Sequence, residues 1–479
     1  MRIPIWLTIV SAIIGLLIVF GLGSLLLQPP SDLIISAGFA DDVITPNADQ
    51  DNDITEFRYE LSQNATISIA FENETGDIFY FREQQARAEG DYQVFFSGVV
   101  DGYLNEGESL VLDLNDNPDG MAVERRLIPD GMYTWRLVAE NENRREERSG
   151  TLTIRDSDSQ LPIMQTFSLS TDVFTPNRDG VSDRVIINIF LEKDADLNVF
   201  LVDENGVELP ISERREWSCD GDDEDCRRYT FDYEGGVDLN QIPPPDGTYR
   251  IVALAQDDEG QRIRRESDIT IQYGGVPRAQ IIPQAVDADV FWVSVPYDER
   301  FFSDADTIGD LIALQDIPDV VSQNEVTVPY GDMLVFRLTV NNYSDIPIRT
   351  THPAVGTVYQ QTQRTASVDA LEEPGAWRVG IACDTSLTDY PYRWALANES
   401  DLITIADQQT GRDYQYLPAN TSTVVWGAIR MTEINEFANP QTCYAGLIHE
   451  GVNVSVENRF VGAIEVQIGD PPNSSTDDN

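Results

Sequence analysis

The chain has 479 residues, of which 41% are hydrophobic, and it carries 82 acidic against 32 basic residues, for a formal net charge of −50 at pH 7. A surface this acidic repels nucleic acids and anionic lipid head groups, so we expect no nucleic-acid partner. The length is too great for one hydrophobic core and suits about three domains of ordinary size.

The N-terminal segment is the most apolar part of the sequence. Residues 3–27 contain no charged side chain, follow Arg2 and end before Gln28-Pro29-Pro30. As a helix rising about 1.5 Å per residue, such a run reaches roughly 37 Å, enough to cross a bilayer. It is longer than the apolar core of a cleaved secretory signal. We therefore expect residues 1–30 to form an uncleaved transmembrane signal anchor. The N-terminus would be cytoplasmic and the body extracytoplasmic, at the cell surface or in the periplasm.

An internal duplication follows the apolar segment. Residues 42–49 (DVITPNAD) reappear as 172–179 (DVFTPNRD), and residues 129–135 (PDGMYTW) reappear as 245–251 (PDGTYRI). The offset between the copies falls from the first match to the second, so the first copy carries an insertion, which we place around residues 103–122. Two matches in the same order indicate two repeats of one structural unit.

Apolar and polar residues alternate between these matches, which predicts β-strands. The predicted fold is all-β: an N-terminal transmembrane helix followed by three tandem β-sandwich (Ig-like) domains. The expected boundaries are 31–157, 158–276 and 277–470, with a disordered tail at 471–479. One short helix is predicted at 306–314. The predicted strands are 58–61, 66–71, 133–137, 151–154, 184–191, 197–202, 249–254, 268–271, 334–342, 377–382, 392–396, 423–430, 444–449 and 463–468.

The second copy shows a family resemblance. Its opening Thr-Pro-Asn-x-Asp-Gly-x-x-Asp at 175–183, with the Pro-Asp-Gly-Thr-Tyr hairpin at 245–249, resembles the Ig-like repeat named after the flagellar hook-capping protein. The opening alone is similar to the C-terminal sorting domains of gliding-motility systems. The resemblance implies a sandwich appended to exported proteins as a spacer, docking module or sorting element. The first copy departs from it, with Gln50 in place of Gly180. The C-terminal domain loosely resembles exported Ig-like domains of the cell-adhesion or fibronectin type.

The openings of both repeats hold alternating Asn and Asp residues, a pattern that can supply oxygen ligands to a hard cation such as calcium. We favour a turn in which these side chains accept hydrogen bonds from their own backbone. Calcium binding remains the alternative. The candidate metal ligands are Asn47, Asp49, Asp51, Asp53, Asn177, Asp179 and Asp183.

The four cysteines predict two disulfides in an exported body. Cys219 and Cys226 would close a short loop that encloses five acidic residues, and Cys383 and Cys443 would form a long-range bridge. Neither spacing matches a zinc site.

The sequence contains no nucleophile elbow, phosphate loop, dinucleotide fingerprint or metalloprotease motif, and it has only two histidines. We therefore expect no enzymatic activity and no essential cofactor. The expected function is that of a membrane-anchored structural or binding protein, with the membrane bound through the N-terminal helix and with a protein or cell-envelope glycan as partner. A carbohydrate-active hydrolase with paired carboxylates and a calcium-dependent adhesin are the alternatives.

Overall fold

The computed structural model describes residues 5–26, 32–105, 108, 110, 121–213, 227–284, 288–319, 324–454 and 456–471. It begins with one α-helix, α1 (Ile5–Leu26), and continues almost entirely as β-strands. Within the described residues, no helix combines the length and apolarity needed to cross a membrane, so the expected transmembrane helix is not confirmed.

The first repeat forms a sandwich that we name unit 1. Phe57 and Trp135 belong to different sheets, and their rings lie 5.2 Å apart in the core between them. The alternate residues of β3 that bracket Arg58 and Glu60 are buried, as the period-two pattern predicts. One sheet has the order β1-β3-β6 and the other β2-β10-β9-β4-β5. The strands are β1 (Ile34–Phe39), β2 (Val43–Ile44), β3 (Thr55–Leu61), β4 (Ala65–Glu72), β5 (Ile78–Arg87), β6 (Gly90–Phe96), β9 (Gly131–Asn141) and β10 (Arg144–Ile154).

The second repeat forms unit 2 with the same plan. Its core lies between a three-stranded sheet, β11-β13-β16, and a larger sheet, β15-β14-β17-β18, to which β12 adds. The strands are β11 (Met164–Leu169), β12 (Val173–Phe174), β13 (Val185–Leu191), β14 (Asp196–Val202), β15 (Glu208–Ile211), β16 (Arg228–Tyr233), β17 (Gly247–Gln256) and β18 (Arg262–Ile271), with a 3₁₀ turn, η3, at Val237–Leu239.

Units 1 and 2 share a sheet. Strands β7 (Val99–Asp101) and β8 (Met121–Leu127), which flank the insertion of the first repeat, extend the larger sheet of unit 2, while Val100 of β7 still packs in the core of unit 1. Strand β8 pairs antiparallel with β18, and Met121 and Val123 pack against the core of unit 2. Strands β7 and β8 thus form a structural link between the repeats.

Unit 3 is a larger sandwich. Its core contains Trp292, Phe336 and Trp394, and the rings of the last two lie 4.7 Å apart. One sheet runs β19-β22-β29-β24 with β20 on β22; the other runs β21-β31-β30-β25-β23-β28-β27 with β26 on β25. The strands are β19 (Ala279–Ile282), β20 (Val290–Val295), β21 (Glu325–Val328), β22 (Met333–Asn342), β23 (Ile348–Thr350), β24 (Val358–Gln360), β25 (Trp377–Cys383), β26 (Tyr392–Trp394), β27 (Ile403–Ala406), β28 (Asp413–Leu417), β29 (Thr421–Arg430), β30 (Gln441–His449) and β31 (Val461–Ile468). The 3₁₀ turns are η4 (Glu299–Phe301), η5 (Leu314–Asp316), η6 (Thr365–Val368), η7 (Glu399–Asp401) and η8 (Val456–Asn458).

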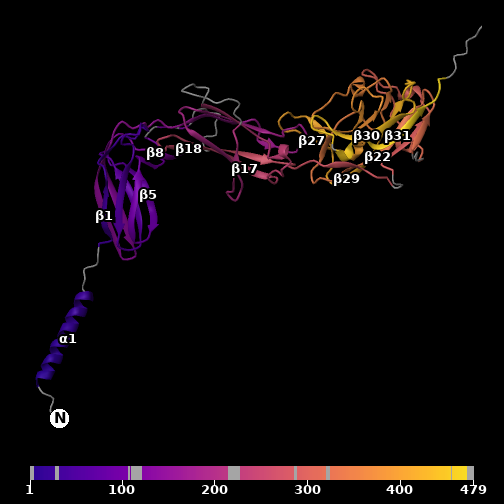
Figure 1. Ribbon diagram of the computed structural model, residues 1–479. Helices are drawn as coiled ribbons and strands as arrows, with labels where there is room; N and C mark the ends of the chain where they lie inside the picture. The colour runs from indigo at the N-terminus through magenta and orange to yellow at the C-terminus, as the bar shows by residue number, and fades with distance from the viewer. Residues whose placement is uncertain are drawn as a thin grey trace, which may run out of the picture.

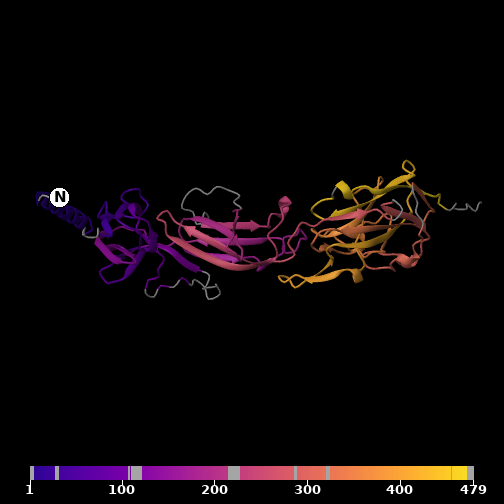
Figure 2. The ribbon, with the colours of Figure 1, turned by 90° about the horizontal axis from the view of Figure 1, so that it is seen from below.

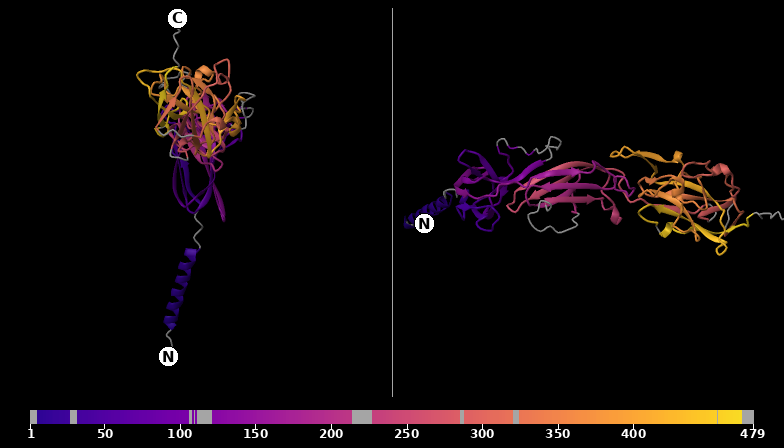
Figure 3. Two further views of the ribbon diagram at one scale, coloured as in Figure 1. Left: turned by 90° about the vertical axis from the view of Figure 1, so that its right-hand side faces the viewer. Right: turned by 90° about the horizontal axis from the view of Figure 1, so that it is seen from above.

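The units lie end to end (Figure 1), with α1 at one end of the chain and unit 3 at the other. Units 2 and 3 lie in one line, and unit 1 is turned at a steep angle to it, as Figure 1 and the left panel of Figure 3 show. The view from below hides this bend (Figure 2). Each predicted strand lies within or overlaps an observed strand, and the all-β class with tandem sandwiches is confirmed.

The predicted helix at 306–314 is wrong. Asp304 accepts main-chain hydrogen bonds from Asp306 and Thr307 in a turn, and Ile312 bonds through its backbone to unit 3. These contacts hold residues 304–313 in an irregular conformation, and the first helical turn in this region is the 3₁₀ turn η5.

Candidate functional sites

The repeated Pro-Asp-Gly hairpins cap the points where the chain leaves units 1 and 2. The Tyr133 hydroxyl donates to the Pro129 carbonyl at 2.7 Å, and the Tyr249 hydroxyl donates to the Pro245 carbonyl at 2.8 Å. The aspartate of each hairpin then accepts two main-chain hydrogen bonds from the exit segment: Asp130 from residues 156 and 157, and Asp246 from residues 273 and 274. The repeated sequence therefore makes the same hydrogen bonds in both units.

The acidic loop of the first repeat is a self-capped turn. Asp53 accepts hydrogen bonds from the backbone N–H groups of Asn47 and Ala48 through Oδ1 and of Gln50 through Oδ2. The Asn47 side chain accepts from Asp49 N, and the Asp49 side chain accepts from Asp51 N. This loop lines a cavity of about 310 Å³ that the turn Asp258–Glu259 of unit 2 also lines.

The second repeat builds the same turn around Asp183. Its Oδ1 accepts from Asn177 N and Asp179 N, and its Oδ2 accepts from Gly180 N at 2.7 Å. Asn177 Oδ1 accepts from Asp179 N, and Asp179 Oδ1 accepts from Val181 N. Unlike the first loop, this one is packed into another unit.

The second loop docks into unit 3. Arg349 donates through Nε to the Asp179 carbonyl and through Nη2 to the Pro374 carbonyl, both at 2.6 Å, and its Nη1 pairs with Glu373 at 3.0 Å. The Tyr416 hydroxyl donates to Asp179 Oδ2 at 2.7 Å. His449 Nε2 lies 2.8 Å from the carbonyl oxygen of Arg178, which fixes this ring nitrogen as the donor.

Two glycines allow this close approach. Gly180 and Gly375 both have positive φ, and a Cβ on Gly375 would lie 2.1 Å from the Asp179 carbonyl carbon. Gly180 is where the first repeat has Gln50, so the glycine belongs to the copy that docks.

Docking changes the acid–base properties of two buried groups. Burial, with the neighbouring charge of Asp183, raises the pKa of Asp179 to about 7. Burial lowers the pKa of His449 to about 4. Both groups are therefore held towards their neutral forms at this junction.

The predicted metal ligands thus lie in two separate turns, four in the first and three in the second. Within the described parts of the chain, no group of three or more His, Cys, Asp or Glu side chains is arranged to hold a metal ion. Calcium binding by these loops stays a prediction.

The end of unit 3 opposite this junction carries a polar pocket. Strands β25 and β30 pair from Trp377–His449, beside unit 2, to Cys383–Cys443, roughly 20 Å further along the strands. The pocket has a volume of about 610 Å³ and is rich in side-chain hydroxyls and amides. Leu387, in its lining, and Phe437, in the neighbouring loop, are fully exposed. The hydroxyl and amide side chains are those of Gln361, Thr362, Gln363, Ser367, Thr385, Ser386, Thr388, Asn435 and Gln441.

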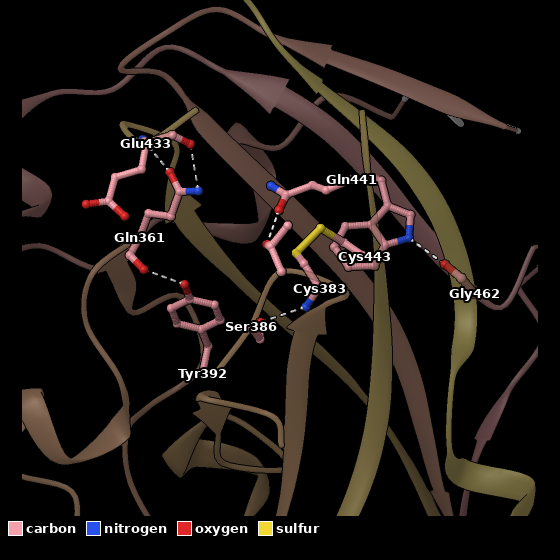
Figure 4. Close-up of a disulfide and its surroundings, with 10 residues drawn as sticks. Gln361, Cys383, Ser386, Tyr392, Glu433, Gln441, Cys443 and Gly462 are labelled. Atoms are coloured by element: carbon pink, nitrogen blue, oxygen red, sulfur yellow. Dashed lines mark hydrogen bonds between the residues drawn. A yellow bond between two sulfur atoms is a disulfide. The ribbon is translucent and has the colours of Figure 1, made fainter. Parts of the chain in front are cut away.

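The base of the pocket is held together by a disulfide and by hydrogen bonds (Figure 4). Cys383 and Cys443 form a disulfide, as the sequence predicts. Gln361 exchanges hydrogen bonds with the backbone of Glu433, and its carbonyl accepts from the Tyr392 hydroxyl at 2.6 Å. The segments around the pocket that contain Gln361, Tyr392 and Glu433 are therefore fixed to one another. The pair Cys219 and Cys226 lies outside the described residues.

A second cavity of unit 3, of about 450 Å³, is lined by several charged and polar side chains, including Arg349, His352, Glu373, Glu399 and Asp413. Glu373 is engaged there by Arg349 and by the Thr351 hydroxyl. The Glu373 carboxylate therefore has a structural role, because it pairs with the arginine that holds the junction between units 2 and 3.

Comparison with known proteins adds little to this geometry. No protein-family profile and no curated protein matches the chain. Solved structures align over most of it at low identity. A tetra-tandem repeat from the extending region of a large adhesion protein is 10% identical, covers 86% of this chain and 81% of its own, and has a TM-score of 0.16. The three N-terminal domains of the highly immunogenic outer capsid protein of bacteriophage RB49 are 8% identical, cover 91% and 99%, and have a TM-score of 0.23.

A structure of a 1.5-MDa bacterial ice-binding adhesin, from work on its host cell surface retention, is 10% identical, covers 83% and 98%, and has a TM-score of 0.18. These scores are too low to support an argument about function. The hook-capping and gliding-motility families are not confirmed, and the fold assignment rests on the sheets themselves.

Proposed function

We propose that this chain is an extracytoplasmic spacer that carries a ligand-binding pocket at the end of unit 3. The observation that carries the proposal is the end-to-end arrangement of the three units, with the polar pocket at the end opposite the junction with unit 2. A shared sheet and a docked loop hold neighbouring units in fixed relative positions, whereas flexible linkers do not.

The chemistry of the pocket favours a neutral polyhydroxylated ligand, such as a cell-envelope glycan. Hydroxyl and amide side chains both donate and accept hydrogen bonds, as sugar hydroxyls require. The exposed Leu387 and Phe437 offer apolar contact beside these polar groups. Displacing water from such mixed surfaces is typical of specific binding sites.

The N-terminal apolar segment is proposed to attach the protein to a membrane. All the described side chains of α1 are exposed, among them Trp6, Leu16 and Val19, and exposing so many apolar groups to water is unfavourable. Separation of membrane and soluble fractions tests this. Recovery of the full chain in the soluble cytoplasmic fraction would overturn both the attachment and the extracytoplasmic placement.

The binding proposal is tested with the full chain on a panel of immobilised neutral oligosaccharides. The double variant Leu387→Asp/Phe437→Asp should lose at least about tenfold in affinity, since it removes the apolar contacts beside the polar groups of the pocket. Ile242→Asp is the matched control, because Ile242 is also apolar and 86% exposed but lies in unit 2. Equal binding by both variants, or no binding by the unaltered chain, would refute a glycan site in this pocket.

A further inference from the structure

The chain contains a single lysine, Lys193, among 31 arginines, and it lies in a cluster of carboxylates. Its Nζ is 2.7 Å from Glu259 Oε2, 3.0 Å from Asp257 Oδ2 and 2.9 Å from Asp158 Oδ2. The exposed fractions of the side chains are 15% for Lys193, 0% for Asp257 and 5% for Glu259, whereas Asp158 is 42% exposed. One amine and two carboxyl groups are thus held together away from bulk water.

The Asp257 carboxyl is also held by two N–H donors of Gln261. The main-chain N–H donates to Oδ1 at 2.8 Å, and the side-chain amide donates to Oδ2 at 2.9 Å. Gln261 itself is fully buried, and its amide also reaches the carbonyls of Asp158 and Gln160. Oδ2 faces Lys193 and would leave as the hydroxyl, so negative charge develops on Oδ1 when the carboxyl carbon is attacked, where the main-chain N–H of Gln261 stabilises it.

We propose that the side chains of Lys193 and Asp257 condense to form an intramolecular isopeptide bond, with Glu259 as the proton-transferring group. Everywhere else the described chain makes its ion pairs with arginine, which serves that purpose well. A guanidinium cannot be deprotonated in a protein, whereas a lysine amine can act as a nucleophile. The one position with lysine is therefore the one where amine chemistry is available.

The reaction balances without a further reactant. Within the ion pair, the ammonium of Lys193 gives one proton to the Asp257 carboxylate, which leaves a neutral amine and a neutral carboxylic acid. The amine nitrogen attacks Cγ of Asp257 to form the new C–N bond. Glu259 accepts a proton from the nitrogen and returns a proton to the departing hydroxyl, which breaks the C–O bond and releases water. The ammonium and carboxylate, together uncharged, become one neutral amide and one water.

The surroundings favour this chemistry. Burial raises the pKa of Glu259, and the charge of Asp257 adds to the effect, so Glu259 can carry the proton that it must donate. Burial opposes the charge on Lys193, but its carboxylate partners outweigh burial and raise the pKa, which is why proton transfer inside the pair has to come first. Fixed neighbours react as if at effective molarities of about 10⁵ M or more, which compensates for an unfavourable protonation equilibrium.

The bond would join the two sheets of unit 2. Lys193 follows β13 of the three-stranded sheet, and Asp257 lies in the turn between β17 and β18 of the larger sheet. The crosslink would resist separation of these sheets in the unit that links the other two, whatever ligand the chain carries. It does not depend on the proposed function.

A lysine-specific endoprotease tests the inference directly on the denatured, reduced full chain. A free Lys193 gives two fragments, 1–193 and 194–479, whereas a bonded Lys193 leaves the chain intact. The mass of the reduced protein should also be lower by one water, and fragmentation should map the link to Lys193 and Asp257. Complete cleavage with the full sequence mass would overturn the proposal, and so would a water loss that maps to any other residue.

Variants separate the reacting groups from their neighbours. Glu259→Gln should leave Lys193 cleavable, because the proton-transferring group is gone, and Lys193→Arg should abolish the loss of water. Asp158→Asn is the matched control: it removes an equally close carboxylate that takes no part in the reaction, so the bond should still form. A bond that forms in Glu259→Gln at the unaltered rate would refute the role of Glu259. The unaltered chain decides the bond itself even if a variant fails to fold.

Discussion

Arg349→Met should loosen the junction between units 2 and 3. The methionine approximates the arginine stem but leaves the carbonyls of Asp179 and Pro374, each 2.6 Å from the guanidinium, without that donor. Only the bond to the Asp179 carbonyl crosses the junction, because Pro374 belongs to unit 3 as Arg349 does. A hydrogen bond to a charged group contributes about 1.5–3 kcal/mol, so its loss predicts a weakening of the junction by about the same amount. The ratio of docked to undocked chains should then fall by roughly 10- to 150-fold.

Small-angle X-ray scattering and limited proteolysis measure this effect. The unaltered chain should scatter as one rigid body, and the variant should show the profile of two bodies joined by a flexible link. An arginine-specific protease should cut the variant faster after Arg278, which lies in the segment between the units.

Arg250→Met is the matched control, because Arg250 pairs with Glu266 on an exposed part of unit 2. Such a surface pair contributes about 0–1 kcal/mol, so this variant should behave like the unaltered chain. If Arg349→Met gives the same scattering profile and the same cleavage rate as the control, the docked loop does not hold the junction.

The remaining predictions concern charge, crosslink and core. In Asp179→Asn, the junction should lose stability as the pH falls from about 6.5 to about 4, because the folded-state pKa of His449 is lowered and the unfolded chain binds its proton first. In His449→Gln, stability should instead rise as the pH falls from about 7 to about 4, because the folded-state pKa of Asp179 is raised; thermal melts across this range would contradict us if both variants had the same slope. The double variant Cys383→Ser/Cys443→Ser opens a link across 60 residues and should lower the free energy of unfolding by about 4 kcal/mol, whereas an unchanged denaturation midpoint would show that the disulfide adds no stability. Glu450→Gln removes the charge buried between Arg378 and Arg393 and should cost about 3–5 kcal/mol by denaturant unfolding, with Arg250→Met again as the control.

The sequence predicted many of the strands well because their alternate residues are buried and exposed. In β4 the alternate residues Ala65, Ile67, Ile69 and Phe71 are buried, which is the pattern that the alternation of apolar and polar residues encodes. The disulfide was predictable because Cys383 and Cys443 lie next to predicted strands; in the structure they are paired residues of β25 and β30. Pairing between units was not predictable, because β8 carries no signal that distinguishes a partner in its own repeat from β18 in the next.

The role of the acidic loops was only partly predictable. The self-capped turn follows from the spacing of Asn177, Asp179 and Asp183, whereas docking depends on Arg349 and Tyr416, which lie more than 150 residues further along the chain. One signal was available in the sequence: Gly180 replaces Gln50 in the second copy. A position that admits only a residue without a Cβ indicates that another backbone comes close.

The two junctions explain why repeats with one ancestry in sequence have diverged in the same loop. Unit 1 reaches unit 2 through β7 and β8, so its acidic loop need not dock, and Gln50 faces the cavity beside Asp258 and Glu259. Unit 2 receives a strand but donates none to unit 3, so its loop must make the contact, and Gly180 permits it.

The same reasoning applies to unit 2 in isolation: without β8, the edge of β18 and the core under Met121 and Val123 would be exposed to solvent. Residues 158–276 alone should therefore be less stable than the same segment extended back to include β7 and β8, because an open strand edge and an uncovered apolar surface both disfavour the folded monomer.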